Sequence, residues 1–156
     1  MKTYFNGNFR TLAWIALAVP AFFLLAASDL CLRSRGALAR AEEETFWRDN
    51  PVKKAAHYED IFKERVSVIS ADRAAGRLTG EQAGRARTLA AAERDFFISE
   101  SSAKQACIWY RTAAEDFRAP FNPWAGEAAK KLPGALAAWR AELAAKGVKA
   151  EDWMIK

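Results

Sequence analysis

An uncharged run near the amino terminus constrains this chain more than any other feature. Residues 11–28 carry no charged side chain, and three apolar residues follow Asp29. About 20 mostly apolar residues are enough to cross the roughly 30 Å hydrocarbon core of a bilayer as an α-helix. The sequence therefore predicts a transmembrane anchor over residues 11–32, preceded by a flank at residues 1–10.

The same run has an alternative interpretation as a cleaved secretory signal, because it follows a basic start. It is longer than the usual apolar signal core of about 7–15 residues. The nearest small-x-small cleavage pattern, residues 37–39, lies beyond Arg33 and Arg35. The aspartate and leucine before Cys31 also depart from the small residues of a lipoprotein signal. We therefore expect the anchor to be retained.

The positive charge of the chain is concentrated around the predicted anchor. Residues 1–40 hold five basic side chains and one acidic one, and so contribute +4 of the net charge of +5. Basic residues beside a membrane segment can meet anionic lipid headgroups. A nucleic-acid-binding domain needs a basic stripe on its own surface. The distribution favours a lipid bilayer as partner and argues against nucleic acid.

The charge pattern leaves two orientations open. Counting lysine and arginine alone, two residues precede the anchor and three follow it closely, which favours a cytoplasmic domain. A basic, secretory-like start favours the opposite arrangement, with the domain outside the cytoplasm. We expect the second arrangement, which in a bacterium is periplasmic.

Past the anchor the chain becomes charged, rich in alanine and typical of helices. Residues 33–50 contain one glycine and are predicted to continue the anchor helix as a stalk, which ends where Asn50 precedes a proline. An extramembrane helical domain is predicted over residues 51–156. Its first helix runs from residue 51 to about residue 75. Apolar residues at three- and four-residue steps give this helix one apolar face: Tyr58, Ile61, Phe62, Val66 and Ile69.

The turn after this helix has clear local signals. Gly76 suits the left-handed position that follows a helix. Thr79 and Gln82 predict a capping box that starts the next helix. Residues 71–82 superficially resemble a calcium-binding loop, but Arg73 and two alanines occupy positions where such a loop needs carboxylates. We therefore reject a calcium site there.

The longest predicted helix of the domain covers residues 80–117, which contain no proline. Five residues recur at every seventh position along it: Leu89, Phe96, Ala103, Tyr110 and Phe117. Alternating large and small residues let helices pack closely, so we expect these five to form one buried helix seam. At roughly 1.5 Å per residue this helix would exceed about 50 Å. One end must then pack on the stalk, the carboxy-terminal segment or another protein.

Other apolar residues lie off this seam or near the carboxy terminus. Phe97, Ile108 and Trp109 indicate a second apolar face, which either packs inside the domain or docks a partner. After a break at residues 118–124, Asn122 is predicted to cap a short helix that ends near residue 131. Residues 132–134, a leucine, a proline and a glycine, predict an interruption before a last helix to residue 146.

No motif of the sequence identifies a chemistry. There is no glycine-rich phosphate loop, no His-Glu-x-x-His and no nucleophile elbow. His57 is the only histidine and is expected at the surface. Cys31 and Cys107 fit no zinc or haem spacing. We expect two unpaired thiols, although an oxidising compartment would permit a disulfide. We therefore expect no cofactor, no metal site and no enzyme activity.

These patterns predict an all-α protein with a single N-terminal transmembrane helix, then an antiparallel helical hairpin with short C-terminal helices. The favoured function is a non-catalytic, single-pass accessory or scaffold subunit of a larger membrane complex. The alternative is a membrane-tethered helical binding module, a sensor or chaperone, for a soluble partner. The candidate partner-binding residues are Phe97, Ile108, Trp109, Trp124, Trp153 and Ile155.

Overall fold

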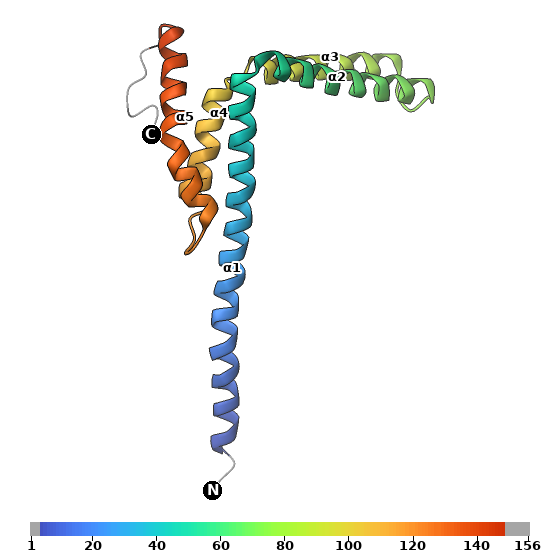
Figure 1. The fold of residues 1–156 in the computed structure, drawn as a ribbon. Helices are drawn as coiled ribbons and strands as arrows, with labels where there is room; N and C mark the ends of the chain where they lie inside the picture. Colours follow the sequence, from blue (N-terminus) through green and yellow to red (C-terminus); the bar gives the residue numbers. More distant parts are fainter. Residues whose placement is uncertain (1–3, 149–156) are drawn as a thin grey trace.

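The computed structural model describes the backbone of residues 4–148 and the side chains of residues 11–148. Over this range the chain is helical and has no strand, which confirms the all-α prediction. Its elements are α1 (Tyr4–Asp49), α2 (Pro51–Ala74), α3 (Gly80–Ser99), α4 (Ser102–Arg111), the π-helix η1 (Thr112–Asp116) and α5 (Pro123–Ala145). Figure 1 shows a long shaft, a bundle beside its far half and an arm that projects sideways.

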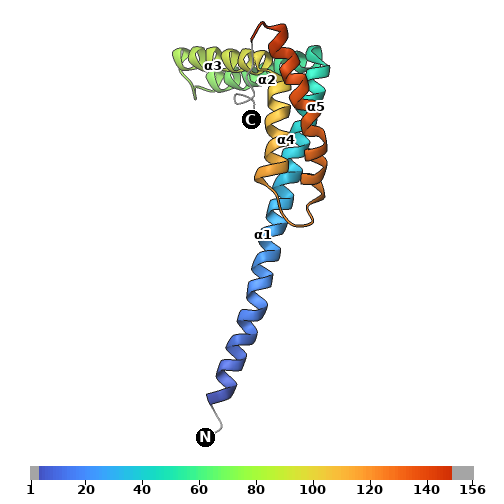
Figure 2. The same ribbon diagram turned by 90° about the vertical axis from the view of Figure 1, so that its left-hand side faces the viewer.

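Helix α1 is the shaft. Its 46 residues continue through Pro20 without a break and extend about 70 Å at roughly 1.5 Å per residue. The part near the amino terminus stands clear of every other element (Figures 1 and 2), and its most apolar stretch buries nothing. In the part of the chain that the structure describes, α1 is the one helix long and apolar enough to span a membrane.

The second half of α1 belongs to a bundle with α5 and with α4, which η1 directly continues. Ser34, Ala37, Leu38 and Ala41 recur at three- and four-residue steps and are all buried. This periodicity places one face of α1 against the other helices, as Figure 2 shows. The residues predicted as a stalk therefore form an integral part of the folded domain.

Small side chains dominate the bundle core, and a few large ones lie among them. The buried cluster comprises Ala37, Leu38, Ala41, Ala106, Cys107, Tyr110, Ala113, Ala128 and Ala135. Alanine at the contact lets helix backbones approach closely. Larger residues, including Trp109, Leu132 and Trp139, pack around this cluster and are half-buried.

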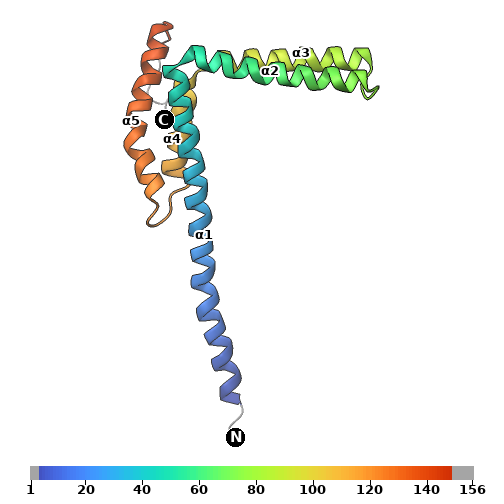
Figure 3. The same cartoon turned by 45° about the vertical axis from the view of Figure 1, so that its right-hand side comes forward.

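Helices α2 and α3 lie side by side and project from the top of α1 at a steep angle (Figures 1 and 3). We call this pair the arm. Its local signals match the sequence: α2 starts at Pro51, Gly76 has φ +69°, and Thr79 and Gln82 form the predicted capping box. The arm buries only four side chains, Lys54, Ile69, Ala83 and Ala90.

The prediction of one helix over residues 80–117 is wrong. The chain leaves the helical conformation at Glu100, where ψ is 137°. Ser101 then caps α4, because its hydroxyl accepts a hydrogen bond from the Lys104 backbone N–H at 3.1 Å. A serine at this position stabilises a new helix start. The break lets the chain turn from the arm into the bundle.

The predicted seam is divided by this break and does not form one buried surface. Ala103 and Tyr110 lie in the bundle core, and Phe117 packs against it. Leu89 and Phe96 lie on α3, where they are 69% and 57% exposed. The arm half of the heptad pattern therefore faces solvent.

The predicted interruption at residues 132–134 is also wrong, because α5 continues through Pro133. Pro133 and Gly134 are exposed, whereas Leu132 and Leu136 pack against the bundle core one turn apart. Proline removes one backbone hydrogen bond of a helix. Apolar packing on the opposite face holds α5 together across that loss.

Candidate functional site

The junction between bundle and arm is built from a series of aromatic rings. We call it the elbow: Phe46, Trp47, His57, Tyr58, Phe96 and Phe97. The Trp47 and His57 rings stack with centroids 5.2 Å apart, and the Tyr58 and Phe97 rings stack at the same distance with planes 8° apart. Each aromatic pair contributes about 0.5–1.5 kcal/mol beyond its buried area. The elbow therefore links α1, α2 and α3 through side-chain contacts.

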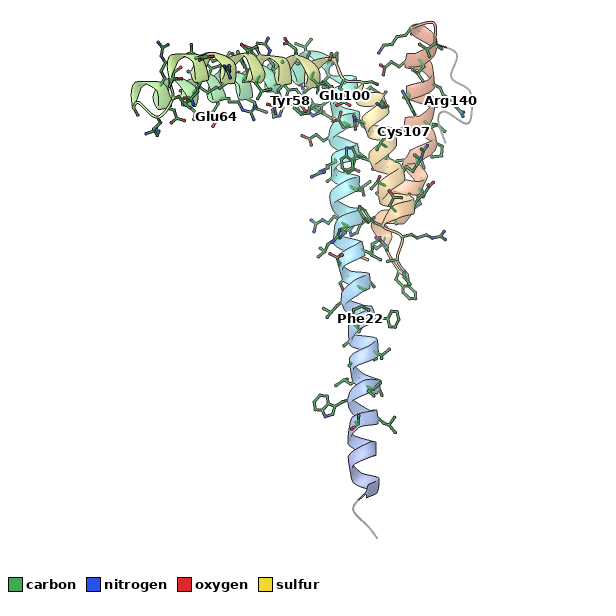
Figure 4. The ribbon with its side chains drawn as sticks, turned by 180° about the vertical axis from the view of Figure 1, so that it is seen from behind. Phe22, Tyr58, Glu64, Glu100, Cys107 and Arg140 are labelled. Carbon is green, nitrogen blue, oxygen red and sulfur yellow. The ribbon has the colours of Figure 1, made fainter. Side chains whose placement is uncertain are left out.

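Polar contacts fix the elbow on its bundle side. The buried Lys54 donates a hydrogen bond from Nζ to the Glu100 carbonyl at 2.7 Å, which ties α2 to the end of α3. Ser101 donates from Oγ to Glu142 Oε2 at 2.5 Å, and so links α4 to α5. Burial opposes ionisation of Glu142, but hydrogen bonds from Lys146 and Ser101 outweigh it and lower the pKa of this carboxyl. Figure 4 shows Glu100 and Tyr58 at this junction.

The elbow suits packing more than acid–base chemistry. Burial, and then the negative charge of Glu44, raises the pKa of Tyr58, so its phenol stays neutral near pH 7. His57 is exposed and stacked on Trp47. Among the described residues, no group of three or more His, Cys, Asp and Glu side chains is placed to hold a metal ion.

Both cysteines are free thiols. Cys107 is 1% exposed in the bundle core, and burial raises its pKa despite the opposing charges of Arg111 and Arg140. Because the thiolate is the reactive form, Cys107 is an inert core residue. Cys31 is half-buried on α1.

The outer surface of the arm carries exposed large apolar side chains among charged ones. The apolar ones are Val52, Ile61, Val68, Leu89, Phe96 and Ile98. Charged side chains such as Lys63, Glu64 and Arg85 are exposed on the same two helices. With about 3.6 residues per turn, Leu89 and Phe96 fall on one face of α3. Between the two helices is a cleft of about 220 Å³ lined by apolar residues such as Ile61, Phe62 and Phe97. The arm therefore buries Ile69, Ala83 and Ala90, half-buries Phe62 and Phe97, and leaves Leu89 and Phe96 exposed.

Ion pairs supplement this thin contact between α2 and α3. Arg94 pairs with Glu59 at 3.2 Å, and its guanidinium carbon lies 4.5 Å from the Phe62 ring centroid. Arg65 pairs with Glu93 across the same interface. Partly exposed pairs of this kind contribute only about 0.2–1 kcal/mol each.

The predicted partner-binding residues do not gather on one surface. Phe97 belongs to the elbow, and Ile108 is 38% exposed on α4. Trp109 lies under Arg40 at 4.7 Å, and Trp124 lies under Arg35 at 5.5 Å. With about 3.6 residues per turn, these two arginines fall on opposite sides of the buried face of α1. Trp153 and Ile155 lie outside the described residues.

Sequence reasoning predicted the helix break between η1 and α5 but did not identify Phe121 within it as a candidate residue. Phe121 at its tip is fully exposed and has φ 59°, the single positive φ among described residues other than glycine. This conformation costs about 1–2 kcal/mol for a residue with a Cβ. Asn122 holds the loop in place: it donates to the Phe117 carbonyl at 3.0 Å and caps α5 as the sequence predicts. An aromatic residue between two prolines in a helix break was the available signal.

Comparison with protein-family models, with curated proteins and with solved structures gives no match. The function is therefore inferred from the arrangement of these residues. Outside residues 11–32, the most exposed large apolar side chains of the described residues are Phe121 on the loop and Val52 and Leu89 on the arm.

Proposed function

We propose that this protein is a non-catalytic, single-pass accessory subunit of a larger membrane complex. Helix α1 anchors it in the bilayer, and the arm, an antiparallel helical hairpin, docks a neighbouring subunit. The exposed apolar residues of α1, such as Phe22 and Leu25, support the anchor. The bundle lies on the extracytoplasmic side, an assignment supported by the basic amino-terminal flank.

The observation that carries this proposal is the pair of exposed apolar side chains on one face of α3, Leu89 and Phe96. Helices α2 and α3 pack on each other and α2 also contacts the end of α1, while these two side chains are mostly exposed. Short helices gain most of their stability in water from packing an apolar face. Exposed apolar patches on a folded protein mark sites of association. A partner helix on this surface would bury both residues.

The height and direction of the arm suit a partner in the same membrane. From Leu32, at the end of the candidate span, to Asp49, where α1 ends, the helix rises about 25 Å at roughly 1.5 Å per residue. The arm leaves α1 at a steep angle (Figures 1 and 3). With α1 across the bilayer, the arm would run above and along the membrane surface. It would meet the extramembrane part of an adjacent subunit.

A membrane-tethered module for a soluble partner is the second candidate. The cleft between α2 and α3 favours it, because apolar residues and the Arg65–Glu93 pair line a small concave site. Such a cleft would accept one apolar side chain of a soluble protein. This candidate predicts reversible binding in place of permanent association.

The test is purification of the full-length protein from its native membrane in mild detergent, with mass spectrometry of bound proteins. The doubly substituted variant Leu89→Asp with Phe96→Asp places charges on the arm, and Val148→Asp is the matched control on another exposed apolar residue. We expect a stoichiometric membrane partner with the wild type and the control, and its loss from the arm variant. A partner that survives both arm substitutions would contradict the proposal. Reversible binding of a soluble protein would favour the second candidate.

A further inference from the structure

The loop between η1 and α5 lies at the end of the bundle nearest the candidate membrane span. Ser34 Oγ donates to the Ala113 carbonyl at 3.0 Å, and Arg35 lies 5.5 Å from the Trp124 ring centroid. These contacts align the two ends of the loop with the first bundle turn of α1. Between them the chain descends beside α1 toward the amino-terminal half, as Figures 1 and 4 show.

The loop presents one aromatic ring, that of Phe121, with little to pack on inside the chain, next to Trp124, which packs under Arg35. Phe121 is fully exposed, and Trp124 is 38% exposed. The hydrogen bonds of Asn122 to Phe117, Trp124 and Ala125 fix the backbone on both sides, so the Phe121 ring is held away from the bundle. Aromatic side chains are enriched where a membrane protein meets the lipid headgroups.

The charges around the loop are mixed. Arg118 is exposed on the loop, and Arg33 and Arg35 are exposed on the neighbouring turn of α1. Arg33 pairs with Asp29 at 2.8 Å, at the edge of the uncharged run. Glu115 and Asp116 precede the loop and offset part of the positive charge. Any membrane contact here must therefore depend mainly on the aromatic rings.

We propose that this loop is a second membrane contact, in which Phe121 inserts into the headgroup region of the bilayer that α1 spans. The proposal rests on the membrane anchoring proposed above. We expect the loop to contact lipid because it lies beside the end of the uncharged run of α1. That run contains exposed apolar residues such as Phe22 and Leu25. Arg35 and Arg118 lie close enough to the same boundary to meet lipid phosphates.

A second contact has a mechanical consequence. A single helix leaves the bundle free to rotate about the membrane normal and to tilt. Insertion of Phe121 on one side of α1 fixes the tilt of the bundle. Through the elbow, the height of the arm above the membrane is then fixed as well.

Spin-label depth measurement in phosphatidylcholine vesicles tests the proposal on the full-length protein. In a Cys31→Ala background, the buried Cys107 should take up no label, which is checked first. Single labels are then introduced at Phe121→Cys, at Leu25→Cys as the anchor reference and at Val148→Cys as the aqueous reference. We expect the ratio of oxygen to nickel-chelate accessibility at position 121 to exceed that at position 148 several-fold.

The reference labels separate the two proposals. A lipid-like label at position 25 with a water-like label at position 121 would overturn the loop contact and leave the anchor intact. Water-like labels at both positions would overturn the anchoring itself. A label at position 121 shielded from both reagents would indicate a protein partner or a second copy, and would also overturn the lipid contact.

A second label keeps the phenylalanine in place. With the label at Arg118→Cys, adding Phe121→Ser should shift it several-fold toward water if the ring holds the loop in the bilayer. An unchanged depth would show that Phe121 does not make the contact.

Discussion

The bundle and the arm are built from similar alanine-rich helices but differ in how far they bury their large side chains. In the bundle, α1, α4 and α5 surround Tyr110 and Cys107, which are almost fully buried. In the arm, only Lys54, Ile69, Ala83 and Ala90 are buried, Phe62 and Phe97 are half-buried, and Leu89 and Phe96 are exposed. A helix with two neighbours can bury a wide face, whereas each arm helix has one neighbour along most of its length. This difference supports the proposal that the arm completes its packing with a partner.

The largest expected contrast comes from placing the same charge in both regions. Tyr110→Asp buries a carboxylate in the bundle core and should destabilise it by more than about 3 kcal/mol. Phe96→Asp adds a charge to an exposed position and should cost less than about 1 kcal/mol, mainly through its ring contact with Phe97. Thermal unfolding followed by circular dichroism measures both. Similar losses of stability would break the distinction between bundle and arm.

A change in volume sharpens the same contrast. Ala106 is fully buried between helices, so Ala106→Leu should overpack the bundle and cost about 1–3 kcal/mol. Leu89→Ala removes an exposed side chain and should change stability by less than about 0.5 kcal/mol. The free energies of unfolding in urea compare the two. A greater loss from the arm substitution would mean that Leu89 is packed within the isolated chain.

The hydrogen bond between α1 and η1 should contribute less to the free energy of unfolding than the core packing does. Ser34 is buried, and its hydroxyl donates to the Ala113 carbonyl at 3.0 Å. Ser34→Ala removes this hydrogen bond and should cost about 1 kcal/mol. Ser28→Ala is the control, because its hydroxyl bonds within α1 to Leu24 and is exposed. Equal melting temperatures for the two variants would show that the Ser34 hydrogen bond does not stabilise the bundle.

The smallest expected effect is a pH dependence at the elbow. The folded pKa of Glu142 lies below its ordinary value of 4.5, so its ionised form stabilises the fold above about that pH. This contribution is lost as pH falls through the folded pKa. Glu142→Gln should therefore cost on the order of 0.5 kcal/mol at pH 7 and should weaken the loss of stability between pH 5 and pH 3. An identical pH profile for both proteins would contradict this role.

Local signals in the sequence predicted several helix starts correctly. Pro51, the capping box of Thr79 and Gln82, and the Asn122 cap all act within a few residues of themselves, and all stand in the structure as predicted. These features could be predicted because their hydrogen bonds involve the neighbouring backbone alone.

Features set by distant partners could not be predicted in the same way. The seven-residue spacing runs without a defect from Leu89 to Phe117. It therefore gives no sign that α3 ends at Ser99 and that Ser101 caps the start of α4. The same period places Tyr110 in a core and Phe96 in solvent, because only the bundle half has helices on both sides. Pro133 normally disfavours a helix interior, but α5 continues through it because Leu132 and Leu136 pack against the bundle core.

The central claim is that the arm binds a partner in the membrane, and photo-crosslinking in intact cells tests it most directly. A photoreactive residue is placed at Leu89 on the arm, and at Val148 as an exposed apolar control outside the arm. The account predicts one discrete adduct with a membrane protein from position 89 and none from position 148. No adduct from the arm, or the same adducts from both positions, would contradict it.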